Sequence, residues 1–164
     1  MASGVTDKGK AWILEAAFRK QINGGAISSD VLYVALITDS TTPNANHDTW
    51  NDLNGAEIAS GNSYDAGGAA IARGTGDFDA ISDDATAESN NYGHVQLKNI
   101  EWTADGGSIP NSGDGARYAI LMDNAGGAAD NTANKVLAWW DLGSDRSVAD
   151  GQKLSLQDME IRLS

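Results

Sequence analysis

The longest uninterrupted apolar run in the chain is Val31–Ile37, which the polar residues Asp30 and Thr38 bound. Seven residues is a common strand length and is too short for a buried helix. Successive strand side chains point to opposite faces, and both sets are apolar here. The pattern therefore predicts a strand over residues 30–38 that is covered on both faces.

Apolar residues recur at helical spacing upstream of this strand, at Ala11, Leu14, Phe18 and Ile22. Such a stripe predicts an amphipathic helix over residues 7–22, and Asn23-Gly24-Gly25 supplies an end signal. We expect this helix to cover one face of the 30–38 strand. The sheet containing residues 116–122 and 135–142 is expected to cover the other face.

Residues 39–63 are a long, mostly polar stretch in which Trp50 and Leu53 are spaced like one face of a short helical turn. Compact domains rarely contain a structureless loop of this length. We therefore expect a short helix that pins the stretch to the body, or a segment that a partner orders.

The remaining apolar runs predict strands over residues 66–72, 94–102, 116–123, 135–142, 152–157 and 160–164. In the 94–102 run, Val95 and Leu97 share one parity whereas Ile100 and Trp102 share the other. We therefore expect a bulge or twist near Lys98-Asn99. A chain of this length fits one domain. The predicted fold class is mainly β: a single-domain β-sandwich or β-barrel-like fold with one N-terminal α-helix packed on it.

The charge balance limits the partners, because 23 acidic and 11 basic residues give a formal net charge of −12. Nucleic-acid affinity comes largely from Lys and Arg that neutralise phosphates, so neither nucleic acid nor an anionic membrane is an expected partner. Solubility or a salty setting accounts for the acidity, with an acidic recognition surface as the alternative. No window approaches the ~18 apolar residues of a membrane span, and Met1–Gly4 begins no signal-peptide pattern.

Few types of side chain in this sequence could act as catalytic groups. The chain has no cysteine, and only His47 and His94 could serve as the usual base of a hydrolytic triad. Neither has the spacing of a nucleophile elbow or a zinc motif. Several carboxylates could pair for glycoside hydrolysis: Asp77, Asp79, Asp83, Asp84 and Glu88. Because acids are abundant in this chain, we favour a solvated acidic face and predict no enzymatic activity.

The glycine-rich stretch of residues 123–131 has the composition of a calcium-binding loop. Asp123 and Asp130 are its candidate ligands for a structural ion. The stretch lacks the closing glutamate of an EF-hand loop, however, so no metal or cofactor is predicted.

Tryptophans raise the alternative of a sugar-stacking platform. Trp139 and Trp140 are adjacent, and neighbouring residues of a strand face opposite ways, so the two cannot line one groove together with Trp102. We expect one of the pair in the core and the other at an interface. The interface candidates are Trp50, Leu53 and Trp139.

Strand and turn motifs follow one another in a set order: Lys8-Gly9-Lys10, Val31–Ile37, Thr42-Pro43-Asn44, Trp50, Glu57-Ile58, Tyr64–Gly68, Ile100–Trp102, Ala116–Leu121 and Leu137–Gly143. This order resembles a family of small structural proteins that tailed bacteriophages encode, often beside capsid genes. The resemblance spans nearly the whole chain and includes no catalytic motif. The loops over residues 104–115 and 123–134 depart from it, because they are longer than the resemblance leads us to expect.

The resemblance implies a non-enzymatic virion protein, made in the host cytoplasm and placed on the capsid exterior as a decoration (cement) protein that stabilises the shell. The implied partners are the major capsid protein and the chain itself in a homo-oligomer, with a trimer as one candidate. The alternative is a tail- or fibre-associated β-sandwich module that binds or cleaves carbohydrate.

Overall fold

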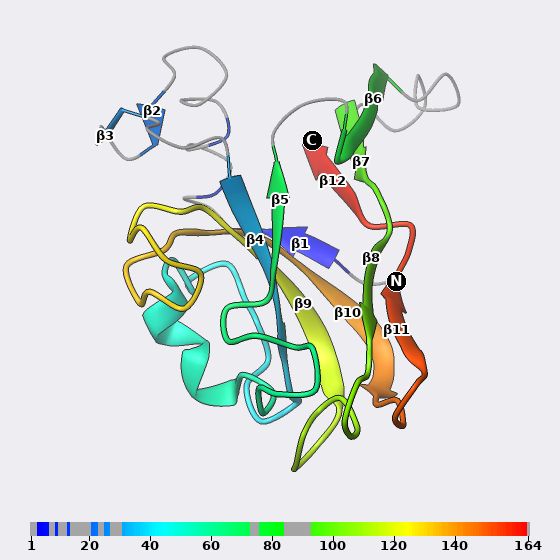
Figure 1. Cartoon of the computed structure of the whole chain (residues 1–164). Coiled ribbons are helices and arrows are strands. Elements are labelled where there is room, and N and C mark those ends of the chain that lie inside the picture. Colours follow the sequence, from blue (N-terminus) through cyan, green and yellow to red (C-terminus); the bar gives the residue numbers. More distant parts are fainter. Residues whose placement is uncertain are drawn as a thin grey trace.

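The structure is a computed structural model that describes residues 3–6, 9, 13, 21–22, 25–26, 31–72, 76–83 and 93–163. These residues form a mainly β protein, as predicted (Figure 1). The strands are β1 (Ser3–Val5), β2 (Gln21–Ile22), β3 (Gly25–Ala26), β4 (Val31–Ile37), β5 (Ala69–Ala72), β6 (Phe78–Asp83), β7 (Gly93–Leu97), β8 (Ile100–Thr103), β9 (Ala116–Met122), β10 (Val136–Arg146), β11 (Lys153–Leu156) and β12 (Glu160–Leu163). Two short 3-10 helices, η1 (Trp50–Asp52) and η2 (Asn54–Ala56), lie between β4 and β5.

The main sheet has the strand order β1-β10-β9-β4-β5, and every neighbouring pair in it is antiparallel. Three smaller ladders accompany it, with the orders β11-β8, β12-β7-β6 and β2-β3. Figure 1 shows β8 and β11 along one side of the main sheet, while η1 and η2 lie on the other side. The main sheet is therefore the central layer of the described structure.

The predicted strand over residues 30–38 is β4, and both of its faces are buried. Leu32, Val34 and Leu36 belong to one core cluster, and Ala35 and Ile37 belong to a second. The continuous apolar run in the sequence correctly predicted a strand with two covered faces.

The prediction that a sheet of residues 116–122 and 135–142 covers one face of this strand was wrong. Residues 116–122 form β9 and residues 136–142 lie in β10. Both strands belong to the same sheet as β4, and β9 pairs directly with β4 along Tyr33–Ile37. These strands are lateral neighbours of β4, so they extend its two faces and do not cover either one. An apolar run that alternates into two cores gives no signal of whether its partner pairs beside it or packs above it.

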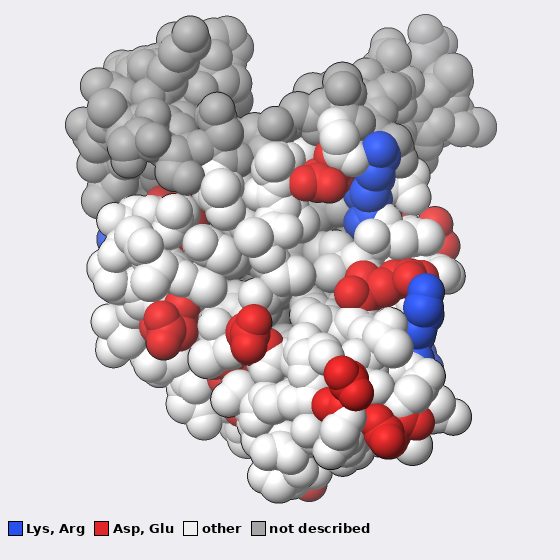
Figure 2. Space-filling view, viewed as in Figure 1, with Lys and Arg blue, Asp and Glu red and all other residues white. Residues whose placement is uncertain are grey.

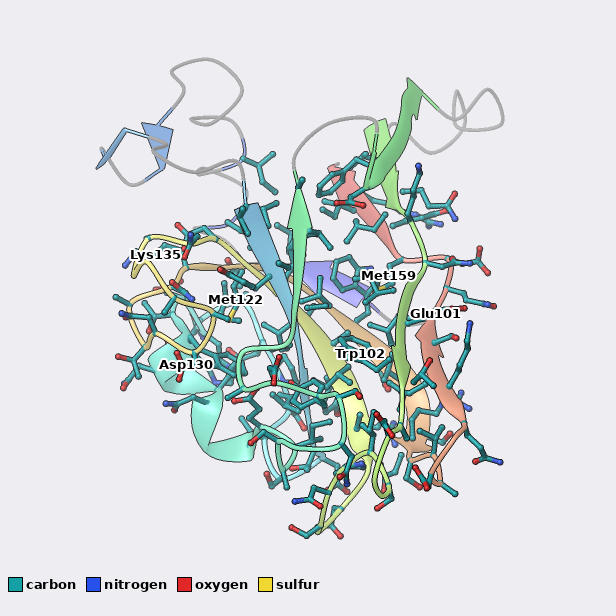
Figure 3. All side chains as sticks on the ribbon, viewed as in Figure 1. Glu101, Trp102, Met122, Asp130, Lys135 and Met159 are labelled. Carbon is teal, nitrogen blue, oxygen red and sulfur yellow. The ribbon has the colours of Figure 1, made fainter. Side chains whose placement is uncertain are left out.

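The first core lies between the main sheet and the ladders of β7, β8, β11 and β12. Its larger members include Leu36, Leu97, Trp102, Leu121, Trp140, Leu154 and Met159. Figure 3 shows Trp102 and Met159 in the space between β8 and the main sheet. Trp140 also ties β10 to β12, because its indole Nε1 donates a hydrogen bond to the carbonyl of Glu160 (2.9 Å).

The second core lies under η1 and η2, where Trp50 and Leu53 pack against β4 and β9. The predicted short helical turn is thereby confirmed. Backbone hydrogen bonds hold the segment at both ends: Trp50 N–H donates to the carbonyl of Asn134 (2.8 Å), and Thr38 N–H donates to that of Ala56 (2.8 Å). The long stretch after β4 is therefore part of the packed body.

Most of the predicted helix over residues 7–22 lies outside the described residues. Its predicted last residue, Ile22, belongs to β2 and pairs with Gly25 of β3, so the predicted helix end is wrong. The sequence between these strands is Asn23-Gly24. An Asn-Gly dipeptide favours a two-residue hairpin as strongly as its glycine favours a helix end, and the hairpin signal was missed.

The predicted strand over residues 94–102 is two strands. The interruption falls at Lys98-Asn99, as predicted, but it is larger than a bulge: β7 pairs with β6 and β12, whereas β8 pairs with β11. Leu97 and Ile100 both enter the first core. One regular strand cannot turn residues of opposite parity to the same side, so the chain changes ladder.

Replacing Trp50 with alanine should lower the free energy of unfolding by roughly 3–5 kcal/mol, because the deletion leaves a large cavity under the sheet. Trp50 is 1% exposed. The neighbouring Asn51 has an exposed side chain, so Asn51→Ala is the matched control and should change stability by about 0.5 kcal/mol or less. Urea unfolding followed by tryptophan fluorescence and circular dichroism measures both. Equal midpoints for the two variants would contradict a second core built on Trp50.

Candidate functional site

The structure places two of the three interface candidates in the core. Trp50 and Leu53 are each 1% exposed, so they hold the 50–56 segment on the sheet and present no contact surface. Trp139 is half-buried at the edge of the second core. Its ring lies directly over Gly4 of β1, where any Cβ atom would overlap it. Of the three, Trp139 alone keeps surface that a partner could touch.

The predicted opposite orientation of the tryptophan pair is confirmed. Trp140 and Trp102 lie in the first core, whereas Trp139 packs against the second. Trp102 makes a tilted ring contact with Tyr64, with centroids 5.8 Å apart. The three tryptophans therefore form no common stacking platform.

The polar side chains of the 123–134 loop bond to the loop's own backbone. The Asp123 carboxylate accepts hydrogen bonds from the N–H groups of Ala125 (3.1 Å) and Lys135 (2.7 Å). The buried Asn134 amide donates to two carbonyls of the same loop, at 2.8 and 2.9 Å. Asp130 is exposed, and no cluster of three His, Cys, Asp or Glu side chains suited to a metal occurs within the described ranges. The Asp- and Asn-rich composition here serves loop closure.

The other candidate groups lie apart from one another or outside the description. His47 Nε2 shares a hydrogen bond with the Asn44 amide in an exposed loop (3.2 Å). Asp77 accepts the Ala72 N–H (2.7 Å) and so caps the end of β5. The side chains of Asp79, Asp83 and His94 are not described, and Asp84 and Glu88 lie outside the described residues.

A buried polar network connects β4 with the loop that follows the 3-10 helices. Tyr64 is fully buried, and its hydroxyl accepts the Leu36 N–H (2.9 Å) and donates to Glu57 Oε1 (2.9 Å). The same Glu57 oxygen accepts the Gly67 N–H (2.6 Å). Gly68 has φ +80°, and a Cβ atom there would overlap the Val34 carbonyl. The loop thus approaches the β4 backbone as closely as glycine permits.

Burial of this network raises the pKa values of its two ionisable groups. Burial is the largest cause that raises the pKa of the Glu57 carboxyl, and the nearby charge of Asp130 raises it further, while the bonds from Gly67 and Tyr64 oppose the shift. Burial also raises the pKa of Tyr64, followed by the charge of Glu57. Glu57 is thus an ionisable group held in place by the loop backbone.

A groove of about 450 Å³ lies beside the first core, between the end of β10 and β11. Its floor includes Leu142, Leu154 and Met159, and its rim carries Arg146 and Lys153. Lys153 forms an ion pair with Glu101 (2.7 Å), which lies on β8 in Figure 3. The groove is thus apolar below and has two basic side chains at its rim, of which Lys153 is ion-paired.

Comparisons with protein-family models, curated proteins and solved structures found no match. Within the part of the chain that the structure describes, no helix has the length and apolar character needed to cross a membrane.

Two features of these sites were not predicted. Glu57 and Tyr64 are conspicuous only through the resemblance, because a tyrosine and a glutamate seven residues apart carry no general motif. Arg146 ends β10 in an ordinary polar stretch, Gly143-Ser144-Asp145-Arg146. Its place beside the groove depends on where β11 lies, which this stretch does not indicate. Neither site has a local sequence signal.

Glu57→Gln should flatten the pH dependence of stability. Because the folded-state pKa of Glu57 is raised, the folded chain binds more protons than the unfolded chain just above the ordinary glutamate pKa near 4.5. The free energy of unfolding of the native protein should therefore fall as pH rises through that window. Glutamine keeps an acceptor for Tyr64 and Gly67 without the charge, so the variant should lose this fall.

The matched control is Glu101→Gln. Lys153 lowers the pKa of the exposed Glu101 carboxyl, so its contribution is lost only as pH falls and the slope above 4.5 should stay unchanged. Urea unfolding over a pH series measures all three proteins. A native-like slope in Glu57→Gln would show that another group produces it.

Proposed function

We propose that this protein is a non-enzymatic virion structural protein of a tailed phage, and specifically a decoration (cement) protein that binds the outer capsid surface and stabilises the shell. One observation carries the proposal: the residues that resemble the phage family are those that build the framework of the fold. The motifs Val31–Ile37, Ala116–Leu121 and Leu137–Gly143 fall on the three adjacent strands β4, β9 and β10.

The shorter motifs connect to the same framework. Trp50 fills the second core, and Tyr64 joins Glu57 to the backbone of β4 through its hydroxyl. Gly68 lies against that backbone. The resemblance thus covers interacting residues from distant parts of the sequence, which supports a shared scaffold more than a set of unrelated matches would.

The charge distribution favours an outward-facing location. Acidic residues outnumber basic ones on the face shown in Figure 2, in keeping with the net charge of −12. Such a surface repels the packaged nucleic acid, so a position outside the shell suits it better than one facing DNA.

The finer fold assignment belongs to the same proposal. We place an N-terminal helix, which begins at about residue 7 and ends before β2, on a β-sandwich, and the first core between the main sheet and the β8–β11 ladder supports the sandwich. The partners in this proposal are the major capsid protein and further copies of the chain, assembled with the closed symmetry usual for small shell proteins.

The purified protein should co-sediment with capsids of its phage and raise the temperature at which those capsids lose their contents. Binding should saturate at a stoichiometry fixed by the capsid lattice. The matched control is the heat-unfolded chain at the same concentration, which should stay in the supernatant. A folded chain that fails to co-sediment with its own undecorated capsids would contradict the proposal.

A carbohydrate-binding module of a tail or fibre is the second candidate, because Trp139 is only half-buried. If this function holds, a glycan array should show binding that Trp139→Ala abolishes and Trp139→Phe largely retains, since an aromatic face stacks on a sugar. Trp50→Ala is unsuitable as a probe, because Trp50 lies in the core. Binding that ignores Trp139 would exclude this residue as the sugar platform.

A further inference from the structure

The end of β10 has a backbone edge that no described strand occupies. β1 pairs with β10 only along Ala138–Trp140. On the other edge, the register against β9 shifts between Asp141 and Arg146, with Gly143 at φ +80° in between. Residues 142–146 therefore extend past β1. Two backbone groups of this segment already have partners, because the Gly143 N–H donates to Asp141 and the Leu142 carbonyl accepts from Arg146, and along the β1 edge the others have no described strand beside them.

The next strand in sequence also leaves an edge toward the groove. Six residues connect β10 to β11, a length that commonly joins two paired antiparallel strands. Here β11 pairs only with β8 among the described strands, and the groove of about 450 Å³ lies between β10 and β11. An extended chain could therefore pair with strand edges on either side of the groove.

The groove has one cation that the described residues leave without an acidic partner. Arg117, Lys153 and Arg162 form ion pairs with Asp141, Glu101 and Glu160. Among the described residues, Arg146 instead donates one hydrogen bond, to the Leu142 carbonyl (3.1 Å). A guanidinium has five N–H donors in a planar fork that matches a carboxylate. Lys98 and Lys135 also form no ion pair with a described residue, but of these three cations Arg146 is the one that lines the groove.

We propose that the β10–β11 groove is a docking site for an extended segment of a partner protein, in which alternate apolar side chains enter the groove and one carboxylate binds Arg146. The strand edges supply main-chain hydrogen bonds, and the floor of Leu142, Leu154 and Met159 receives the apolar side chains. The charge complementarity at Arg146 selects an acidic segment. This interaction goes beyond the proposed capsid function and does not depend on it.

The test uses a displayed library of random peptides selected against the full chain. Enriched peptides should alternate apolar with polar residues and carry an Asp or Glu. Arg146→Gln should weaken the binding of a selected peptide roughly tenfold or more, because a charge-assisted bond is lost. Arg146→Lys, which keeps the charge and loses the fork, should fall between the two.

Lys135→Gln is the matched control, since Lys135 lies on the other side of the molecule from β11 (Figures 1 and 3). It should bind like the native protein, and circular dichroism and the urea midpoint should show all variants folded. Amide NMR shifts on peptide addition should concentrate in residues 142–148 and 153–157.

Three results would overturn the proposal: no enriched peptide, equal binding by folded Arg146→Gln, or NMR shifts confined to another surface. Analytical ultracentrifugation tests the other possible occupant of the groove, a second copy of the chain. If the native chain self-associates and Arg146→Gln does not, the groove binds a second copy, and the assignment to a partner's segment is wrong.

Discussion

The fold depends on the burial of one strand on both faces. Strand β4 contributes alternate side chains to two separate cores, and its neighbour β9 does the same. Burial of apolar surface is worth roughly 25 cal/mol per Å², so a strand with two buried faces gains about twice what a surface strand gains. In return, each face needs its own cover. The ladders of β8 and β11 supply one cover, and the short helical segment at residues 50–56 supplies the other.

This requirement explains why the long stretch after β4 is ordered. A loop that carries the cover of a core has to be fixed to the sheet, and hydrogen bonds to Leu36 and Thr38 do this beside the packing of Trp50. Burying the connecting loop also buries Glu57, whose charge is disfavoured there. Tyr64 and the Gly67 N–H reduce that cost by hydrogen bonding to the carboxylate.

Local patterns in the sequence predicted those features that depend on local geometry. The two-faced strand, the helical turn at Trp50, the break at Lys98-Asn99 and the opposite orientation of Trp139 and Trp140 all follow from side-chain parity or spacing. Pairing could not be predicted in the same way, because β9, one of the two strands that pair with β4, lies more than 80 residues away in sequence. The groove at Arg146 depends on two strands that fail to pair, and no residue pattern records a missing pairing.

The proposed function places this two-core body on the outside of a phage capsid. A cryo-EM map of the phage particle tests that claim most directly, because the five-stranded sheet and the 50–56 segment together have a recognisable shape. We predict density for the fold on the outer capsid surface, in contact with the major capsid protein and repeated with the lattice symmetry. The claim would be contradicted if particles that are known to contain the chain showed bare outer capsid surfaces, with density for the fold in the tail or nowhere in the map.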